Sequence, residues 1–328
     1  MGADQVGRLL GLLPAQLPSP GGRRLPALAQ VRVLVTGAAG QLGRALVPAL
    51  AARGHEPVAR TRRELDLSLP GAAREALERL RPDVVVNAAA YTKVDRAESE
   101  PEAAHRDNQL AVRHLVNACA ATGVACCHVS TDFVFGGPPP RPDHRWREWD
   151  RPEPRGVYAA SKWAGEQELL HGGARSYLVR TAWLYGAEGP NFVLTMCRLA
   201  RRDGRLRVVQ DQQGSPTWTG HLAPAIARLV ETRAFGVYHL TNGGETSWWG
   251  FARAIVGGLG LDVPVEPIAT ADFGAPAPRP VRSVLDAGAW RALGEAPLPD
   301  WEVGLNAYLA GEREGAIAAA LAAGSVPP

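Results

Sequence analysis

Apolar positions recur along the chain with two periods, and their alternation predicts strands that alternate with helices. Short runs rich in valine and alanine predict strands, and longer stretches with an apolar residue every three or four positions predict helices. The expected strands are the start of 31–43, then 56–60, 83–90, 125–131 and 176–182, and the expected helices are 41–53, 72–81, 103–122 and 157–170. This alternation is typical of right-handed crossovers, and therefore of a doubly wound parallel sheet.

The pattern becomes less regular beyond Tyr185 and Gly186, which predicts a second, smaller lobe. Helices are expected at 192–202, 222–231 and 248–259, and strands at 207–210 and 237–241. We therefore predict an α/β chain with a doubly wound parallel Rossmann sheet and a smaller C-terminal α/β substrate lobe. The expected division is a disordered extension at 1–30, a dinucleotide-binding domain at 31–188 that segment 205–240 partly rejoins, a substrate-binding lobe at 189–310, and a tail at 311–328 with one more helix or none.

Composition and charge narrow the class of protein. The chain has 328 residues, of which 46% are hydrophobic. It has no run of roughly 18 apolar residues that could span a membrane. Its net charge is +3 and its arginines are scattered, which argues against nucleic acid as the main partner. The four cysteines show no Cys-x-x-Cys spacing, which favours reduced, buried thiols. We expect a soluble cytoplasmic protein whose partner is a small molecule.

The segment Val31–Gly43, VRVLVTGAAGQLG, carries glycines at Gly37, Gly40 and Gly43. Between a strand and a helix, such glycines allow a tight turn, a close approach of the backbone to a pyrophosphate, and close packing of helix on strand. Free N–H groups and the helix dipole would then face the phosphates. The spacing indicates a dinucleotide site, although a glycine triplet also occurs in ordinary strand-to-helix turns.

Tyr158 and Lys162 form the second chemical feature. Residues four apart on a helix share one face, so the ammonium group can lie close to the phenol and lower its pKa, which makes the phenol a usable general acid. The hydroxyls of Ser130 and Thr131 stand at the end of an expected strand, at the edge where open α/β sheets bind ligands. An isolated Tyr-x-x-x-Lys pair on a solvated helix face is the competing interpretation. The proline- and arginine-rich segment 136–155 is either a surface loop or a flap over this edge.

Three segments are more specific than the glycine turn and the Tyr-Lys pair: NAAAYTKVDRAE, STDFVF and DQQGSPT. With others they cover most of 31–310 in one order, and together they resemble the dTDP-4-dehydrorhamnose reductases, a branch of the extended short-chain dehydrogenase/reductase superfamily. The resemblance implies an NAD(P)H-dependent oxidoreductase that reduces the C4 ketone of a dTDP-4-dehydro-6-deoxyhexose. The product would be dTDP-L-rhamnose or a related antibiotic deoxysugar such as dihydrostreptose.

The resemblance also implies site residues. Tyr158 would protonate the developing alkoxide, Lys162 would tune the phenol and hold the nicotinamide ribose, and Thr131 would bond the same oxygen, with Ser130 a weaker candidate. The implied cofactor-binding residues are Gly37, Gly40, Gln41, Leu42, Asp66, Leu67, Ala90, Tyr91, Thr92, Tyr158 and Lys162. The implied substrate-binding residues are Thr131, Asp132, Trp183 and Asn191. Trp183 could instead be a core aromatic at a strand end.

Cofactor choice follows from the residues after the second strand. An NAD-specific domain would carry an acidic residue there, whereas this chain has Arg60, Thr61, Arg62 and Arg63. Arginines suit a 2′-phosphate, so Arg60 is a further cofactor-binding candidate, and we predict NADPH as the cofactor, with NADH as the alternative.

The chain departs from the family in two places. Some members carry a metal-bridging glutamate shortly after the third glycine, where this chain has Arg44. We therefore predict no metal, and a monomer or weak homodimer. Arg282 stands where the family has asparagine, and with the unusual segment 136–155 it leaves the identity of the sugar open.

Two alternative functions remain open. One is a non-catalytic dinucleotide-binding regulatory subunit similar to the beta subunit of methionine adenosyltransferase, against which the intact Tyr158, Lys162 and Thr131 argue. The other is a nucleotide-sugar epimerase or dehydratase, which Asp132 partly fits.

Overall fold

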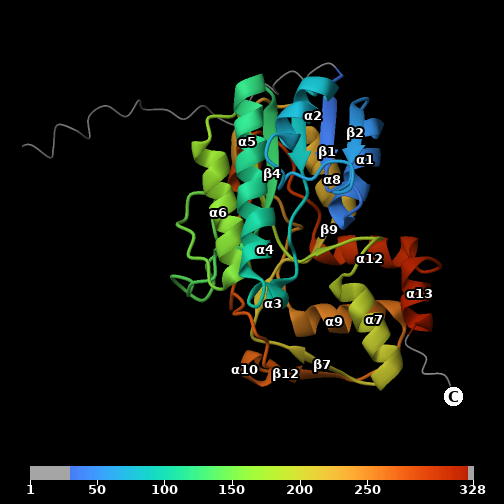
Figure 1. The fold of residues 1–328 in the computed structure, drawn as a ribbon. Coiled ribbons are helices and arrows are strands. Elements are labelled where there is room, and N and C mark those ends of the chain that lie inside the picture. The colour runs from blue at the N-terminus through green and yellow to red at the C-terminus, as the bar shows by residue number, and fades with distance from the viewer. Residues whose placement is uncertain (1–29, 324–328) are drawn as a thin grey trace, which may run out of the picture.

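A computed structural model describes residues 30–323 of the chain (Figure 1). The prediction of a disordered extension at 1–30 lies, except for Gln30, outside the described residues. The predicted fold class is confirmed: a parallel α/β sheet with helices on both faces carries a smaller second lobe (Figure 1). Within residues 30–323, no helix combines the length and the apolar character needed to cross a membrane.

Six parallel strands form the main sheet, in the order β10-β5-β4-β3-β1-β2. Their bounds are β1 Arg32–Thr36, β2 Glu56–Arg60, β3 Val84–Asn87, β4 Ala125–Thr131, β5 Ser176–Thr181 and β10 Gly236–His239. The register pairs Thr36 with Asn87, Asn87 with His128, and Thr131 with Thr181. Strand order reverses between β1 and β3, and such a switch point is where open α/β sheets bind ligands.

Helices cover both faces of the sheet because its strands are apolar on both sides. On one face, α1 (Gln41–Ala52) and α8 (Thr219–Leu229) pack on alternate strand residues such as Val35 and Val86. On the other face lie α2 (Ala72–Leu80), α5 (Ala111–Thr122) and α6 (Val157–His171). The helix predicted at 103–122 is divided into α4 (Pro101–His105), a π-helix (Arg106–Leu110) and α5. All four cysteines are free and buried, as predicted.

The second lobe has its own core (Figure 1). Its main helices are α7 (Phe192–Asp203), α9 (Trp248–Leu259), α12 (Trp301–Gly311) and α13 (Ala316–Ala322), and β7 (Leu206–Val209) pairs with β12 (Val265–Ile268). The tail beyond Gly311 therefore contains one more helix. The pattern did not predict β12 or α12. It also did not predict the short elements α3 (Val94–Ala97), a 3-10 turn (Asp132–Val134), β6 (Leu184–Tyr185), β8 (Gln213–Gly214), β9 (Thr217–Trp218), β11 (Thr246–Ser247), α10 (Thr270–Phe273) and α11 (Gly288–Ala292).

Segment 136–155 is tied to the body of the protein rather than lying free on its surface. Trp146 stacks on Phe135 at a centroid distance of 4.7 Å, and its Nε1 donates to the Arg282 carbonyl at 2.9 Å. The buried Glu148 carboxylate accepts the backbone N–H groups of His239 and Ala289. These bonds make this part of the segment a fixed wall between the sheet and the C-terminal region.

Candidate active site

The glycine turn after β1 has the geometry of an anion-binding loop. Gly37 has φ +67°, and a Cβ there would stand 2.6 Å from the Ala89 backbone nitrogen. A Cβ on Gly43 would overlap the Gly37 carbonyl oxygen, so both positions require glycine. Gly40 is the N-cap of α1 and supplies no side chain to cap it. The first N–H groups of α1 are thus left for an external acceptor, which fits the diphosphate of a dinucleotide.

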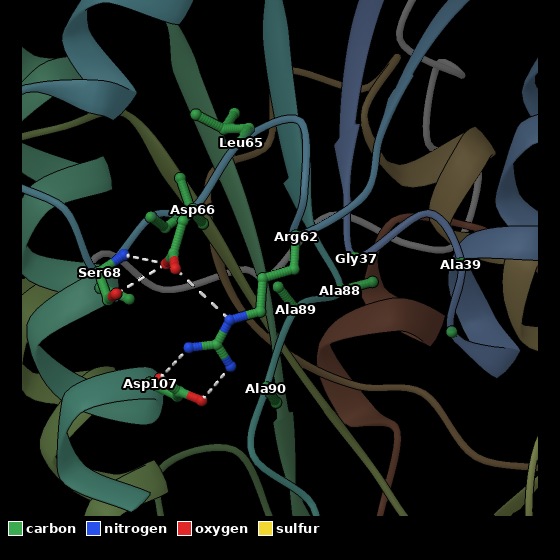
Figure 2. Close-up of a pocket in the computed structure, with 13 residues that line it drawn as sticks. Gly37, Ala39, Arg62, Leu65, Asp66, Ser68, Ala88, Ala89, Ala90 and Asp107 are labelled. Carbon is green, nitrogen blue, oxygen red and sulfur yellow. Dashed lines mark hydrogen bonds and ion pairs between the residues drawn. The ribbon is translucent and has the colours of Figure 1, made fainter. Parts of the chain in front are cut away.

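A cavity of about 260 Å³ opens beside this turn (Figure 2). Five of the residues predicted to bind a cofactor line it: Gly37, Gly40, Asp66, Leu67 and Ala90. The lining residues outside the predicted set are Ala39, Arg62, Leu65, Ser68, Ala88, Ala89, Asp107 and Ala111. No periodicity in the sequence could have identified Asp107, because a π-helix distant from the loop presents it.

Arg62, rather than Arg60, reaches this cavity. Its guanidinium donates to both oxygens of Asp107, at 2.7 and 3.1 Å, and its Nε lies 3.5 Å from Asp66 Oδ2 (Figure 2). Burial would raise the pKa of Asp66, but hydrogen bonds from Ser68 and the charge of Arg62 outweigh it and lower that pKa. The Arg60 guanidinium folds back onto the Ala59 carbonyl, so its contact with a cofactor stays a prediction.

The other predicted cofactor residues already have partners in the protein or face solvent. Gln41 donates to the Pro190 carbonyl, and Leu42 packs in the sheet core. The backbone N–H of Tyr91 donates to Asn108, its phenol donates to Glu100, and Thr92 is exposed. Their contacts with a cofactor stay predictions.

Tyr158 and Thr131 meet at the carboxyl end of β4. Burial raises the pKa of Tyr158 to about 12, a hydrogen bond with Thr131 opposes that rise, and the charge of Asp132 adds to it. The Thr131 hydroxyl donates to Asp132 Oδ1 at 3.1 Å and accepts the Phe133 N–H at 3.2 Å. A phenol and a hydroxyl therefore lie together, and a substrate oxygen could accept from both if the Thr131 hydroxyl turns its hydrogen away from Asp132. Ser130 is not part of this pair. Its hydroxyl donates instead to the buried carboxylate of Glu166, two turns further along α6 than Tyr158.

Lys162 does not lower the pKa of Tyr158 in this structure, which corrects the expectation drawn from their spacing. Its Nζ donates to the Val129 carbonyl at 2.8 Å and lies 3.5 Å from His128 Nε2. Burial lowers the pKa of Lys162 to about 8, although the charge of Glu166 opposes that change. Desolvation of both groups outweighs the attraction that the sequence pattern predicted.

The residues predicted to bind substrate differ in their burial and in the contacts they already make within the protein. Asp132 is 1% exposed, accepts from Ser283 Oγ at 2.5 Å, and has a pKa raised to about 7 by burial. Trp183 is half-buried with φ +46° and stacks on Trp248 at a centroid distance of 3.5 Å. Asn191 caps α7, since its Oδ1 accepts the Leu194 N–H and its amide donates to Gly186. Contact of these residues with a sugar nucleotide stays a prediction.

The positive φ of Trp183 is strained for a non-glycine residue, and the surrounding packing maintains it. A Cβ on Gly214 would overlap the Trp183 indole, so the glycine of the DQQGSPT segment makes room for this side chain. Backbone strain of this kind is concentrated at binding and catalytic sites. A binding role for Trp183 is consistent with this strain and stays a prediction.

The chain was compared with protein families, with curated proteins and with solved structures, and the three comparisons agree. The family described as RmlD substrate binding domain matches residues 31–313. A dTDP-4-dehydrorhamnose reductase of Streptomyces griseus is 45% identical over 84% of this chain and 92% of its own length. A dTDP-4-keto-6-deoxy-D-glucose reductase of Streptomyces niveus is 39% identical over 84% of this chain and 95% of its own length. The crystal structure of a Bacillus anthracis dTDP-4-dehydrorhamnose reductase in complex with NADP matches with a TM-score of 0.83, at 37% identity, over 86% of this chain and all of that one.

Proposed function

The chain belongs to the dTDP-4-dehydrorhamnose reductase family, and on this premise we propose that it uses NADPH to reduce the C4 ketone of a dTDP-linked 4-dehydro-6-deoxyhexose. The observation that carries the proposal is the phenol of Tyr158 beside the Thr131 hydroxyl at the carboxyl edge of the sheet. The same edge holds the cavity at the glycine turn. NADPH is favoured because Arg62 lines that cavity and because a relative of known structure was solved in complex with NADP.

The cofactor and the protein residues have separate roles in the proposed reaction. The bound nicotinamide would supply the hydride to C4, and the protein must place the ketone and supply a proton. Thr131 would hold the carbonyl oxygen, and Tyr158 would protonate it as negative charge develops. Because the pKa of Tyr158 is about 12, the phenol is protonated at neutral pH and ready to act as the acid.

Purified protein, NADPH and dTDP-4-dehydro-6-deoxyglucose, with and without the matching 3,5-epimerase, provide the test. We expect NADPH absorbance to fall in step with substrate added, and to do so only with the epimerase if the substrate is dTDP-4-dehydro-L-rhamnose. Oxidation without the epimerase would identify a different deoxysugar. An epimerase or dehydratase would convert sugar without net NADPH consumption. Cofactor binding without any turnover would favour a regulatory subunit, against which the presence of Tyr158, Lys162 and Thr131 argues.

The position of Arg282 bears on which sugar the protein binds. Arg282 is buried, with its Nε on the His144 carbonyl and its guanidinium paired with Glu245, so this departure from the family joins segment 136–155 to the second lobe. This supports a reshaped pocket wall rather than a new charge facing the sugar. A cytoplasmic monomer or weak homodimer stays our prediction.

Cofactor preference should depend on Asp107, which holds Arg62 and places a negative charge in the cavity. We expect Asp107→Asn to free the guanidinium for a 2′-phosphate and to raise the ratio of kcat/KM for NADPH to that for NADH about fivefold. Steady-state kinetics with both cofactors measure this ratio. Asp203→Asn, at an exposed arginine pair at the end of α7, is the matched control and should leave it unchanged. An unchanged ratio in Asp107→Asn would show that Arg62 does not read the phosphate.

A further inference from the structure

Tyr158 lies in the first turn of α6, and the ends of helices are where they fray most easily. The helix begins at Val157, so Tyr158 is its second residue. The backbone N–H groups of a first turn have no carbonyl partner within the helix. Gly156, which precedes the helix, has no side chain that could accept from them. The position of the phenol therefore depends on other parts of the chain that hold this turn.

Glu98, in the segment that follows β3, supplies the missing cap. Its Oε1 accepts the backbone N–H of Val157 at 2.8 Å. A Cβ on Gly156 would stand 2.8 Å from the same oxygen, so the carboxylate lies directly against the start of the helix. The first turn of α6 contains no acidic residue of its own, and a negative charge at this end of a helix is favourable. Glu98 thus serves α6 as an N-cap side chain serves other helices.

An ion pair joins the segment of Glu98 to a second segment at the same place. Asp95 is paired with Arg279 through two hydrogen bonds, at 3.0 and 2.8 Å, which lower the pKa of Asp95. A Cβ on Gly156 would also stand 2.9 Å from Pro278 Cδ, next to that arginine. The helix α3, which contains Asp95, packs against α6 (Figure 1). The start of α6 is therefore held by two segments that are tied to each other.

The beginning of the Glu98 segment lines the cofactor cavity. Residues 88–90 are part of the cavity wall, and Tyr91 follows them. The Asn108 side chain accepts the Tyr91 N–H at 2.8 Å, donates to the Tyr91 carbonyl, and donates to Ser161 Oγ on α6. The Ser161 hydroxyl in turn donates to the Tyr158 carbonyl. One short segment, 88–98, is thus attached to α6 on both sides of Tyr158 and relates the phenol to the cavity.

We propose that Glu98 is a positioning residue for Tyr158: its carboxylate caps α6 and fixes the phenol relative to Thr131 and the cofactor cavity. The inference rests on the proposed function, in which Tyr158 protonates the substrate oxygen. Burial, Thr131 and Asp132 set the pKa of the phenol, so the contribution of Glu98 is geometric. A neutral oxygen acceptor in the same place should therefore replace the carboxylate without moving the pH profile of kcat.

Replacing Glu98 by alanine removes the cap. We expect kcat to fall about tenfold, because a small displacement of a catalytic group is costly in rate. Glu98→Gln keeps an oxygen that can accept the Val157 N–H, so its kcat should stay within about twofold of the wild type, with the same pH profile. Glu102→Ala removes an exposed carboxylate from the first turn of α4 and is the matched control, with kcat unchanged.

Two kinetic results would overturn the proposal. One is an unchanged kcat in Glu98→Ala. The other is a loss in Glu98→Gln as large as that in Glu98→Ala, because the charge rather than the hydrogen bond would then be the cause. The Kd of NADPH, measured by fluorescence titration, should stay within a factor of about two in both variants, since Glu98 does not line the cavity.

A double variant shows whether the loss passes through Tyr158. In a Tyr158→Phe background, Glu98→Ala should lower the remaining kcat by less than about twofold, since the group that Glu98 positions is gone. The same loss of about tenfold in that background would mean a general disturbance of the site, and would overturn the positioning role.

Amide hydrogen exchange tests the cap without any turnover. We expect the peptide that contains Val157 and Tyr158 to exchange about tenfold faster in Glu98→Ala than in the wild type, and at nearly the wild-type rate in Glu98→Gln. Unchanged exchange in Glu98→Ala would show that Glu98 does not hold the start of α6, and would overturn the proposal. Absence of NADPH oxidation by the wild type would instead reject the proposed function, while the exchange result would still test the cap.

Discussion

Replacing Tyr158 by phenylalanine is expected to lower kcat about 10³-fold, because general acid catalysis by a positioned side chain contributes an effect of this size. The phenol lies within hydrogen-bonding reach of the Thr131 hydroxyl, and its loss leaves the developing alkoxide only that hydroxyl, which does not readily give up its proton. NADPH affinity should stay within a factor of about two, since the cavity at the glycine turn does not include Tyr158. Kinetics of NADPH oxidation and NADPH fluorescence titration measure the two quantities.

Tyr177→Phe is the control for this substitution. Tyr177 lies in β5 with its hydroxyl 3.4 Å from the Val230 carbonyl, in the core between the sheet and its helices. The same loss of a hydroxyl there should leave kcat near the wild-type value. Near-normal turnover in Tyr158→Phe would remove Tyr158 from the proton transfer, whereas loss of NADPH binding as well would indicate a folding defect.

The inner strands of the main sheet were predictable because strands buried on both faces are apolar at nearly every position. The predicted bounds 125–131 agree with β4, and the bounds 56–60 agree with β2 although this edge strand is only partly buried. The strand predicted at 83–90 ends at Asn87 instead, and the Ala89 N–H donates to the Asn87 side chain rather than to a neighbouring strand. The apolar residues continue beyond the strand, so the hydrophobic pattern could not locate its end.

The site was predictable to the extent that its residues lie near each other in sequence. The glycine turn and the helix with Tyr158 and Lys162 are local features, and the structure places both at the carboxyl edge of the sheet. Arg62 and Asp107 are 45 residues apart, and their pairing depends on a π-helix that periodicity does not reveal. The pKa of Tyr158 was expected to fall, and burial raises it instead, because desolvation depends on all the surrounding packing.

Glu166→Gln should strongly destabilise the protein, although it lies in the helix that carries Tyr158 and Lys162 and touches neither the glycine turn nor its cavity. Glu166 is fully buried, accepts from Arg180 and from Ser130, and follows Lys162 by one turn. Its removal leaves the buried Arg180 guanidinium without a counter-charge, which costs about 3 kcal/mol in the free energy of unfolding. We expect the Tm to fall by roughly 5 °C, measured by calorimetry or circular dichroism.

Glu168→Gln on the same helix is the matched control. Glu168 also pairs with an arginine, Arg113, but the Arg113 side chain is 47% exposed, so its guanidinium can be hydrated when the partner is lost. Its substitution should therefore cost about 0.5 kcal/mol. Equal loss in Glu166→Gln and Glu168→Gln would contradict the claim that burial makes the first pair costly to break.

The double variant Glu166→Gln, Arg180→Met decides whether the unpaired charge is the cause. Methionine removes the guanidinium while filling much of its volume, so part of the lost stability should return relative to Glu166→Gln alone. If stability falls further instead, the Arg180 contacts with His239 and the Glu148 carbonyl matter more than the charge balance. In that case the pair would chiefly anchor segment 136–155 against the sheet, and the catalytic helix would depend on that wall for its position.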